Sequence, residues 1–222
     1  MPASISEGVT AQVIERLFRA AEEGDPQVFA KIQTTQARRN DAESLNFYTE
    51  ALAEAYIPVS REGGKLLYML VRAQKSHTVV EFGTSFGIST IHLAAAVRDN
   101  GGGRVISTEL NSNKIRQARK NLTEAQVADY VEILEGDALE TLRNKEIPSV
   151  DFVLLDGWKK MYLPILNLLE PRLSKNAIIV ADDINLFPGQ TKSYLDYVRN
   201  PTNGYTSVEL PIEDGLELSV RS

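Results

Sequence analysis

Three carboxylates follow apolar, strand-like runs of this 222-residue chain, and their type and placement could bind a metal ion. Asp156 follows the run 151–155, and Asp182 and Asp183 follow the run 177–181. Carboxylates that meet at one rim repel one another and need a cation. Oxygen ligands without histidine or cysteine select a hard ion such as Mg²⁺, Ca²⁺ or Mn²⁺. In the alternative interpretation Asp182 or Asp183 caps the following turn, which fits one of them better than all three.

A glycine-containing turn and a later carboxylate together predict a nucleoside site. Gly83 and Gly87 follow the run 78–82 and allow a ligand to approach the backbone closely. Their spacing is G-x-x-x-G and not the G-x-G-x-x-G of dinucleotide-binding turns. Glu109 ends the next run, where a carboxylate can bind both hydroxyls of an adenosine ribose. Each feature alone fits an ordinary turn or a solvated strand end equally well, but together they favour nucleoside binding. The turn 135–138 follows the third run and is expected beside the adenine.

Short apolar runs alternate with helical segments from residue 77 onward, which is typical of a parallel sheet with helices on both faces. The predicted strands are 78–82, 104–108, 131–134, 151–155, 177–181, 206–210 and 216–220. The predicted helices between them are 88–97, 114–124, 162–169 and 193–198. The last two strands flank Asp214-Gly215 and predict a hairpin, which places one antiparallel strand in the sheet.

Helical periodicity dominates the chain before residue 72. Apolar residues recur at helical spacing over 13–21, 45–55 and 66–71. Gly24-Asp25-Pro26 predicts a break after the first run, and Pro58 ends the second.

The pattern therefore predicts a doubly wound, Rossmann-like α/β fold with a mostly parallel seven-stranded sheet. We expect a single domain over 1–222, with a helical N-terminal cap at 1–72 and a cofactor-binding core at 77–222.

Composition and charge narrow the class of protein. The formal net charge is −6, from 30 acidic and 24 basic residues, whereas a nucleic-acid partner favours a basic surface. No cysteine is present, which excludes disulfides, zinc–thiolate sites and thiol nucleophiles. No apolar run approaches the roughly 18 residues that span a bilayer, and the N-terminus lacks the features of a secretory signal. These observations predict a cytoplasmic protein without a membrane partner. His77 and His92 are interpreted as structural.

The same segments resemble the class I, S-adenosylmethionine-dependent O-methyltransferases of the catechol and caffeoyl-CoA O-methyltransferase family. The resemblance covers roughly residues 55 to 220. The D-x-W-K pattern at 156–159 is its most specific part and is closest to the catechol enzyme. The resemblance is carried by 59–67, 81–90, Glu109, 156–159, 162–164, 181–183 and 210–216.

The resemblance implies S-adenosylmethionine as cofactor, Mg²⁺ as the metal, and a role for each matching residue. The implied cofactor-binding residues are Val59, Glu81, Gly83, Ser85, Gly87, Ser89, Glu109, Leu110, Asp137, Ala138, Asp156 and Trp158. The implied metal ligands are Asp156, Asp182 and Asp183. Lys159 would be the general base and would contact the substrate together with Trp158 and Glu209. The family usually has Asp-Asn where this chain has Asp182-Asp183, so the extra carboxylate either makes the site more anionic or is not a ligand.

We therefore expect methyl transfer to one hydroxyl of a catechol-type small molecule by a homodimer. A free phenol has a pKa near 10, and coordination to a metal lowers that pKa, so that Lys159 can remove the proton. One alternative is a tRNA-hydroxyl methyltransferase of the same fold, which the net charge disfavours. Another is a nicotinamide-dependent oxidoreductase, which the absence of G-x-G-x-x-G disfavours. A third is a non-catalytic nucleoside-binding protein, against which Lys159 and Asp156 argue.

Overall fold

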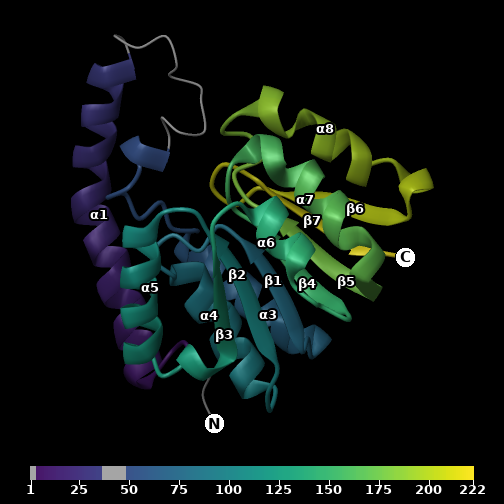
Figure 1. The fold of residues 1–222 in the computed structure, drawn as a ribbon, viewed down its shortest axis with the longest axis horizontal. Helices are drawn as coiled ribbons and strands as arrows, with labels where there is room; N and C mark the ends of the chain where they lie inside the picture. The colour runs from purple at the N-terminus through teal and green to yellow at the C-terminus, as the bar shows by residue number, and fades with distance from the viewer. Residues whose placement is uncertain (1–3, 37–48) are drawn as a thin grey trace.

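A seven-stranded sheet lies at the centre of the computed structural model, which describes residues 4–36 and 49–222 (Figure 1). Its strands are β1 (Thr78–Phe82), β2 (Arg104–Glu109), β3 (Val131–Glu135), β4 (Val150–Leu155), β5 (Leu173–Ala181), β6 (Tyr205–Leu210) and β7 (Leu216–Arg221). The strand order is β3-β2-β1-β4-β5-β7-β6. The first five strands in this order, β3 to β5, pair with their neighbours in parallel. β7 is antiparallel to both β5 and β6. The predicted fold class, including the single antiparallel strand, is confirmed.

Helices cover both faces of the sheet, and this explains why most residues of the central strands β1, β2 and β4 are buried. One layer holds α1 (Gly8–Gln36), α3 (Arg61–Gln74), α4 (Ile88–Asp99) and α5 (Ser112–Glu124). The other holds α6 (Ala138–Asn144), α7 (Tyr162–Leu169) and α8 (Pro188–Val198). Val79 packs into the first layer and its neighbour Val80 into the second, because successive strand residues point to opposite faces.

The first helix does not break where the sequence predicts. α1 runs without interruption from Gly8 to Gln36, with Pro26 inside it. Proline removes one backbone donor but leaves the helix intact when packing holds both sides. Val13 and Leu17 before the proline, and Val28 and Ile32 after it, are all buried. The prediction of a break at Gly24-Asp25-Pro26 is therefore wrong.

α3 and α6 each begin directly after a residue whose side chain caps the helix N-terminus. The side chain of Ser60 accepts a hydrogen bond from the backbone N–H of Gly63 and caps α3, and Asp137 caps α6 in the same way through Leu139. α6 was not predicted from the sequence. Part of the predicted helical run at 45–55 lies outside the described residues. Short 3₁₀ turns occupy Ala128–Tyr130, Lys159–Met161, Glu170–Arg172 and Pro201–Asn203.

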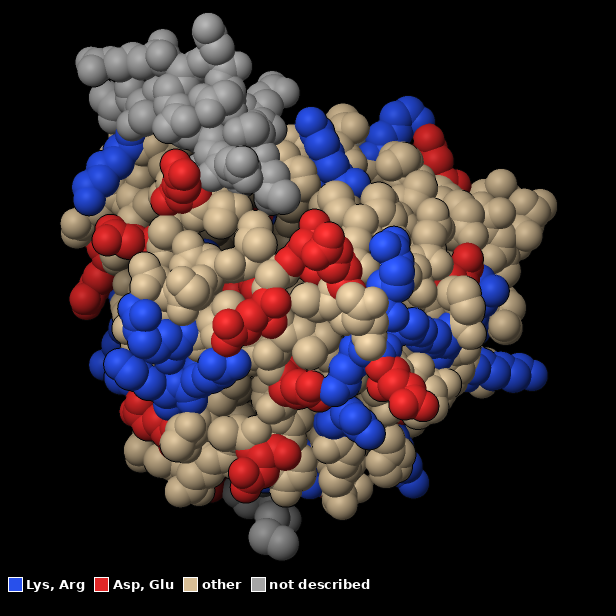
Figure 2. All heavy atoms as spheres, viewed as in Figure 1, with Lys and Arg blue, Asp and Glu red and all other residues tan. Residues whose placement is uncertain are grey.

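The surface carries both signs of charge. Figure 2 shows basic and acidic side chains interspersed over the face in view. Among the described residues, no helix has the length and apolar character needed to cross a bilayer.

Candidate active site

A cavity of about 910 Å³ lies where the parallel strands end at their carboxyl termini. Chain order reverses between β1 and β4, which is where doubly wound sheets bind ligands. The turn after β1 passes very close to the turn after β4 there. A Cβ atom on Gly83 would lie 2.5 Å from the backbone oxygen of Asp156, and the φ of Gly83 is +107°. Only glycine fits both conditions, so Gly83 lets the two turns share one wall.

Most of the predicted site residues line this cavity. The predicted residues on its wall are Val59, Gly83, Ser85, Ser89, Glu109, Leu110, Asp137, Ala138, Asp156, Trp158, Lys159 and Asp183. Glu81, Gly87, Asp182 and Glu209 are not on the wall. Gly87 instead precedes the first residue of α4 in the left-handed conformation. Asp156 after β4 and Asp183 after β5 therefore reach the same cavity as Glu109, the last residue of β2.

The three aspartates form one cluster. Asp156, Asp182 and Asp183 each offer a carboxylate oxygen, and these oxygens all lie within 4.8 Å of one another. Burial, followed by the negative charge of Asp182, raises the pKa of Asp156 well above its usual range. Burial and the charge of Asp183 raise the pKa of Asp182 to about 7. A bound cation would relieve the repulsion that contributes to both shifts. The donor set, oxygen alone, fits a hard divalent ion.

Lys159 is buried beside this cluster. Its Nζ donates to the Tyr162 hydroxyl at 2.8 Å, to the Asp183 carboxylate at 3.1 Å and to the Asp182 backbone carbonyl at 3.3 Å. A carboxylate oxygen of Asp156 is 3.8 Å away. The Tyr162 hydroxyl donates in turn to the Asp182 carbonyl at 2.9 Å. The amine is therefore fixed within reach of any ligand bound at the three aspartates.

Glu109 organises the opposite end of the cavity. Its carboxylate accepts hydrogen bonds from the backbone N–H groups of Ser85, Leu110 and Asn111, at 2.8 to 2.9 Å. These bonds join the turns after β1 and β2. Because a carboxylate has about four lone-pair positions and these bonds use three, Glu109 can still accept a further hydrogen bond from a ligand.

Glu81 lies beneath the cavity wall. It is fully buried and accepts hydrogen bonds from the hydroxyls of Ser89, Thr90 and Ser107. Burial raises its pKa, and the three hydroxyls oppose that shift. Ser89 lies on the wall and Glu81 lies behind it. Glu81 therefore affects the cavity by fixing the orientation of the Ser89 hydroxyl.

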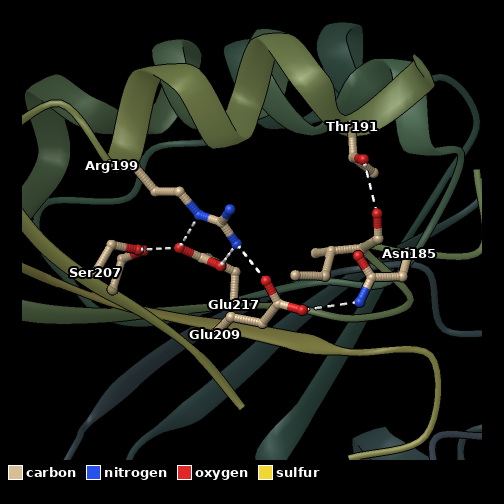
Figure 3. Close-up of polar contacts among 8 residues, drawn as sticks. Asn185, Thr191, Arg199, Ser207, Glu209 and Glu217 are labelled. Atoms are coloured by element: carbon tan, nitrogen blue, oxygen red, sulfur yellow. Dashed lines mark hydrogen bonds and ion pairs between the residues drawn. The ribbon is translucent and has the colours of Figure 1, made fainter. Parts of the chain in front are cut away.

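Glu209 lies away from the cavity, on β6. Its carboxylate binds the Arg199 guanidinium at 2.9 Å and the Asn185 side-chain amide at 2.9 Å. Arg199 also pairs with the fully buried Glu217 on β7. Figure 3 shows this chain of contacts from β7 through Arg199 and Glu209 to Asn185, below α8. The structure therefore connects Glu209 to the segment that follows Asp183 and not to the cavity.

Several functional contacts were missed from the sequence. Asp25, inside α1, accepts hydrogen bonds from the backbone N–H groups of Tyr56 at 2.7 Å and Ile57 at 2.9 Å. Both of these residues line the cavity. Lys114 also lines it. A signal for Lys114 was available, because it shares a helical face with Ala118 and Asn121, which are buried.

Comparisons with known proteins agree on one family. Residues 80–184 match a family model described as a methyltransferase domain. Catechol O-methyltransferase B of Danio rerio is 33% identical over 211 residues, covering 88% of this chain and 78% of that protein. Catechol O-methyltransferase of Mycobacterium tuberculosis is 35% identical over 128 residues, 58% of this chain and 57% of that protein. The structure of O-methyltransferase TomG from Streptomyces achromogenes, involved in tomaymycin synthesis and in complex with S-adenosylmethionine, has a TM-score of 0.67. It is 25% identical, and the match covers 75% of this chain and 82% of TomG.

Proposed function

Because the chain belongs to the S-adenosylmethionine-dependent O-methyltransferases of the catechol O-methyltransferase type, we propose that it methylates one hydroxyl of a catechol-type phenol with the help of a divalent cation. The enzyme class and the methyl donor follow from the family. The metal, the base and the acceptor are the proposed parts. The observation that supports them is the Lys159 amine, 3.1 Å from Asp183, in the cavity that also holds Glu109.

Asp156, Asp182 and Asp183 would hold the cation, with Mg²⁺ as the proposed ion. Three clustered carboxylate oxygens match its preference for hard ligands. A bound cation of this kind lowers the pKa of a phenol by withdrawing electron density from its oxygen.

Glu109 would hold the ribose hydroxyls of S-adenosylmethionine, and Asp137, Ala138 and Trp158 would border its adenine. Val59, Ser85 and Ser89 would contact its methionine end. Together these contacts would orient the methyl group toward the aspartate cluster, and orientation of this kind can supply a large part of a rate enhancement.

Lys159 would take the proton from the acceptor hydroxyl. The acceptor oxygen would bond to the methyl carbon as the carbon–sulfur bond breaks, so that S-adenosylhomocysteine would leave as a neutral thioether. Tyr162 keeps the Lys159 amine in place through its hydroxyl. A homodimer and a cytoplasmic location remain predictions from the sequence.

The test compares catechol with resorcinol, whose hydroxyls are too far apart to chelate one cation. Product formation from isotope-labelled S-adenosylmethionine is followed by mass spectrometry, with added Mg²⁺ and with EDTA. We expect methylated catechol only when the metal is present and little product from resorcinol. Equal product from both diols, or full activity in EDTA, contradicts the proposal.

A further inference from the structure

Among the described residues on the cavity wall, only two are basic, and they lie in different surroundings. These are Lys114 and Lys159. Lys159 is paired with the aspartate cluster. In the described part of the chain, no carboxylate forms an ion pair with Lys114. The wall also carries Asp25, Glu109, Asp137, Asp156, Asp183, Glu213 and Asp214. A cavity this acidic holds cationic groups readily, whereas an anionic group needs one of the two lysines.

Lys114 points its amine at the turn after β1. The residue is 7% exposed. Its Nζ donates to the Ser85 hydroxyl at 3.1 Å, and Ser85 in turn donates to the backbone carbonyl of Tyr56 at 2.7 Å. The ring of Phe86 lies 5.6 Å from the same nitrogen. Lys114 therefore brings a positive charge to the turn that holds Ser85, which the proposed function places at the methionine end of the donor.

The charges around Lys114 support its ammonium form. Burial lowers the pKa of Lys114, and the negative charges of Glu109, Asp25 and Asp156 oppose that shift. Taking an ammonium out of water is unfavourable unless it gains an anionic or hydrogen-bonding partner. A single hydroxyl is a weak partner for such a group, so a second, anionic partner is expected from a ligand.

A second positive feature faces the same turn. α4 begins at Ile88 directly after this turn, and its N-cap residue is Gly87, which has no side chain to cap the helix. Ile88 and Ser89, its first two residues, line the cavity. The free backbone N–H groups of a helix's first turn attract anions. The buried lysine contacts Ser85, and the start of α4 follows Ser85 by three residues, so both lie at the same turn.

We propose that Lys114 binds the α-carboxylate of the methionine end of S-adenosylmethionine. The inference rests on the proposed donor site and adds a residue to it. The methionine end carries one carboxylate beside an ammonium and a sulfonium. The acidic residues of the wall match the cationic groups, and Lys114 matches the carboxylate. Lys114 would therefore distinguish the intact donor from derivatives that lack the carboxylate.

The test uses S-adenosylhomocysteine and its decarboxylated derivative, with binding measured by isothermal titration calorimetry. Lys114→Met removes the charge and keeps most of the side-chain volume. Lys120→Met is the matched control, because Lys120 lies on the same helix and is exposed. Lys114→Arg keeps a positive charge at this position and tests whether that charge restores the affinity for S-adenosylhomocysteine.

We expect Lys114→Met to weaken binding of S-adenosylhomocysteine by about 10- to 100-fold, as for other hydrogen bonds between charged groups. Binding of the decarboxylated derivative should weaken by less than about threefold, because the lost contact is missing from that ligand. Lys114→Arg should recover part of the affinity for S-adenosylhomocysteine, and Lys120→Met should leave both affinities unchanged.

Two results overturn the assignment of Lys114. Equal weakening for both ligands means that Lys114 acts through Ser85 and Tyr56 alone, and no weakening for either means that it contacts neither ligand. If the unaltered protein does not bind S-adenosylhomocysteine, the proposed donor site itself fails. That result is distinct from a failure of Lys114.

Discussion

The Lys159 amine is held by the hydroxyl of Tyr162, which begins α7, and by the Asp182 carbonyl and the Asp183 carboxylate, which follow β5. Such a side chain cannot adopt other rotamers without losing these bonds. Lys159 is buried and its neighbour Lys160 is exposed. Substituting each in turn therefore tests whether the buried amine acts as a general base, with its exposed neighbour as the control.

Lys159→Met should lower kcat by about 10²- to 10⁴-fold, the usual contribution of a positioned general base. Binding of S-adenosylhomocysteine, measured by calorimetry, should change little, which shows that the variant is folded. Lys160→Met should turn over catechol at the rate of the unaltered protein. Turnover by Lys159→Met at that same rate would remove Lys159 from the mechanism.

At the residue scale, sequence reasoning succeeds where a side chain follows directly from a strand end. Asp156 and Glu109 belong to this class, because the end of a parallel strand fixes where the next residue lies. Glu209 shows the limit. A shift of one residue along a strand moves a side chain to the other face of the sheet, and Glu209 lies on the face that meets Arg199. Asp25 was out of reach, because its partners are 31 and 32 positions away in the sequence.

At the scale of elements, α3 and α4 cross closely at Gly64. A Cβ atom there would lie 2.8 Å from the ring of His92. This ring cannot move easily, because its Nδ1 is hydrogen-bonded to the Ile88 carbonyl at 2.8 Å. The ring also packs edge-on against the ring of Phe18. The contact between the two helices thus depends on a residue without a side chain.

Gly64→Ala should lower the free energy of unfolding by about 1–3 kcal/mol, the usual cost of overpacking a core. Gly24→Ala is the matched control, since an added Cβ in α1 meets no described atom within 4 Å. That control should raise stability by about 0.5–1 kcal/mol, because alanine is the better helix former. Urea unfolding monitored by circular dichroism measures both. Equal stability of the two variants would contradict the steric argument.

The segment after β5 is held by neighbouring elements on several sides. Backbone N–H groups of Ile184 and Asn185 donate to carbonyls of the β6–β7 turn, and Thr191 of α8 donates to the Ile184 carbonyl. The Asn185 amide is fixed by Glu209. Asp183 begins this segment in the left-handed conformation, at a φ of 55°. The geometry of the proposed metal ligand therefore depends in part on residues that are not on the cavity wall, such as Thr191 and Glu209.

Glu209→Ala should weaken Mg²⁺ binding by about tenfold, as loss of a residue that orients a ligand does in other metal sites. The fold should survive, because Arg199 keeps its partner Glu217. Calorimetric titration with Mg²⁺ measures the effect, and Thr206→Ala, an exposed position on the same strand, should behave as the unaltered protein. Unchanged Mg²⁺ affinity in Glu209→Ala would show that the metal site does not depend on the contact between Glu209 and Asn185.

Elements were predictable from sequence to the extent that their patterns are local. The predicted bounds of β1 and α7 agree with the structure, since each is a contiguous apolar segment with clear flanks. α6 was not predicted, because its seven residues are too few to show a helical period of apolar residues. The run through Pro26 was misjudged because burial of apolar residues on both sides outweighs the missing donor.

At the scale of the whole molecule, His92 links stability to pH. Burial lowers the pKa of His92 to about 4, whereas an unfolded histidine has a pKa near 6.5. Above about pH 6.5 the residue is neutral in both states. Between those values the unfolded chain binds a proton that the folded chain does not, so stability falls as the pH falls. The loss by pH 4 is about 3 kcal/mol.

His92→Phe should lose less stability than the unaltered protein when urea unfolding is measured at pH 7 and again at pH 4.5. The phenyl ring fills similar space and takes up no proton. His77→Gln serves as the control, because His77 is exposed and its replacement should leave the pH dependence unchanged. An identical loss in His92→Phe would assign the acid sensitivity to the carboxylates.

The contact of Asp25 with Tyr56 and Ile57 has a consequence for how this enzyme can diversify. Phe29 and Ile32 of the same helix form part of the cavity wall, although α1 is not part of the sheet. The groups proposed for catalysis lie at strand ends more than a hundred residues further along the chain. Mutation in α1 can therefore reshape the wall while those groups stay untouched. Ligand preference and chemistry reside in separable stretches of the gene, and selection can act on one without disturbing the other.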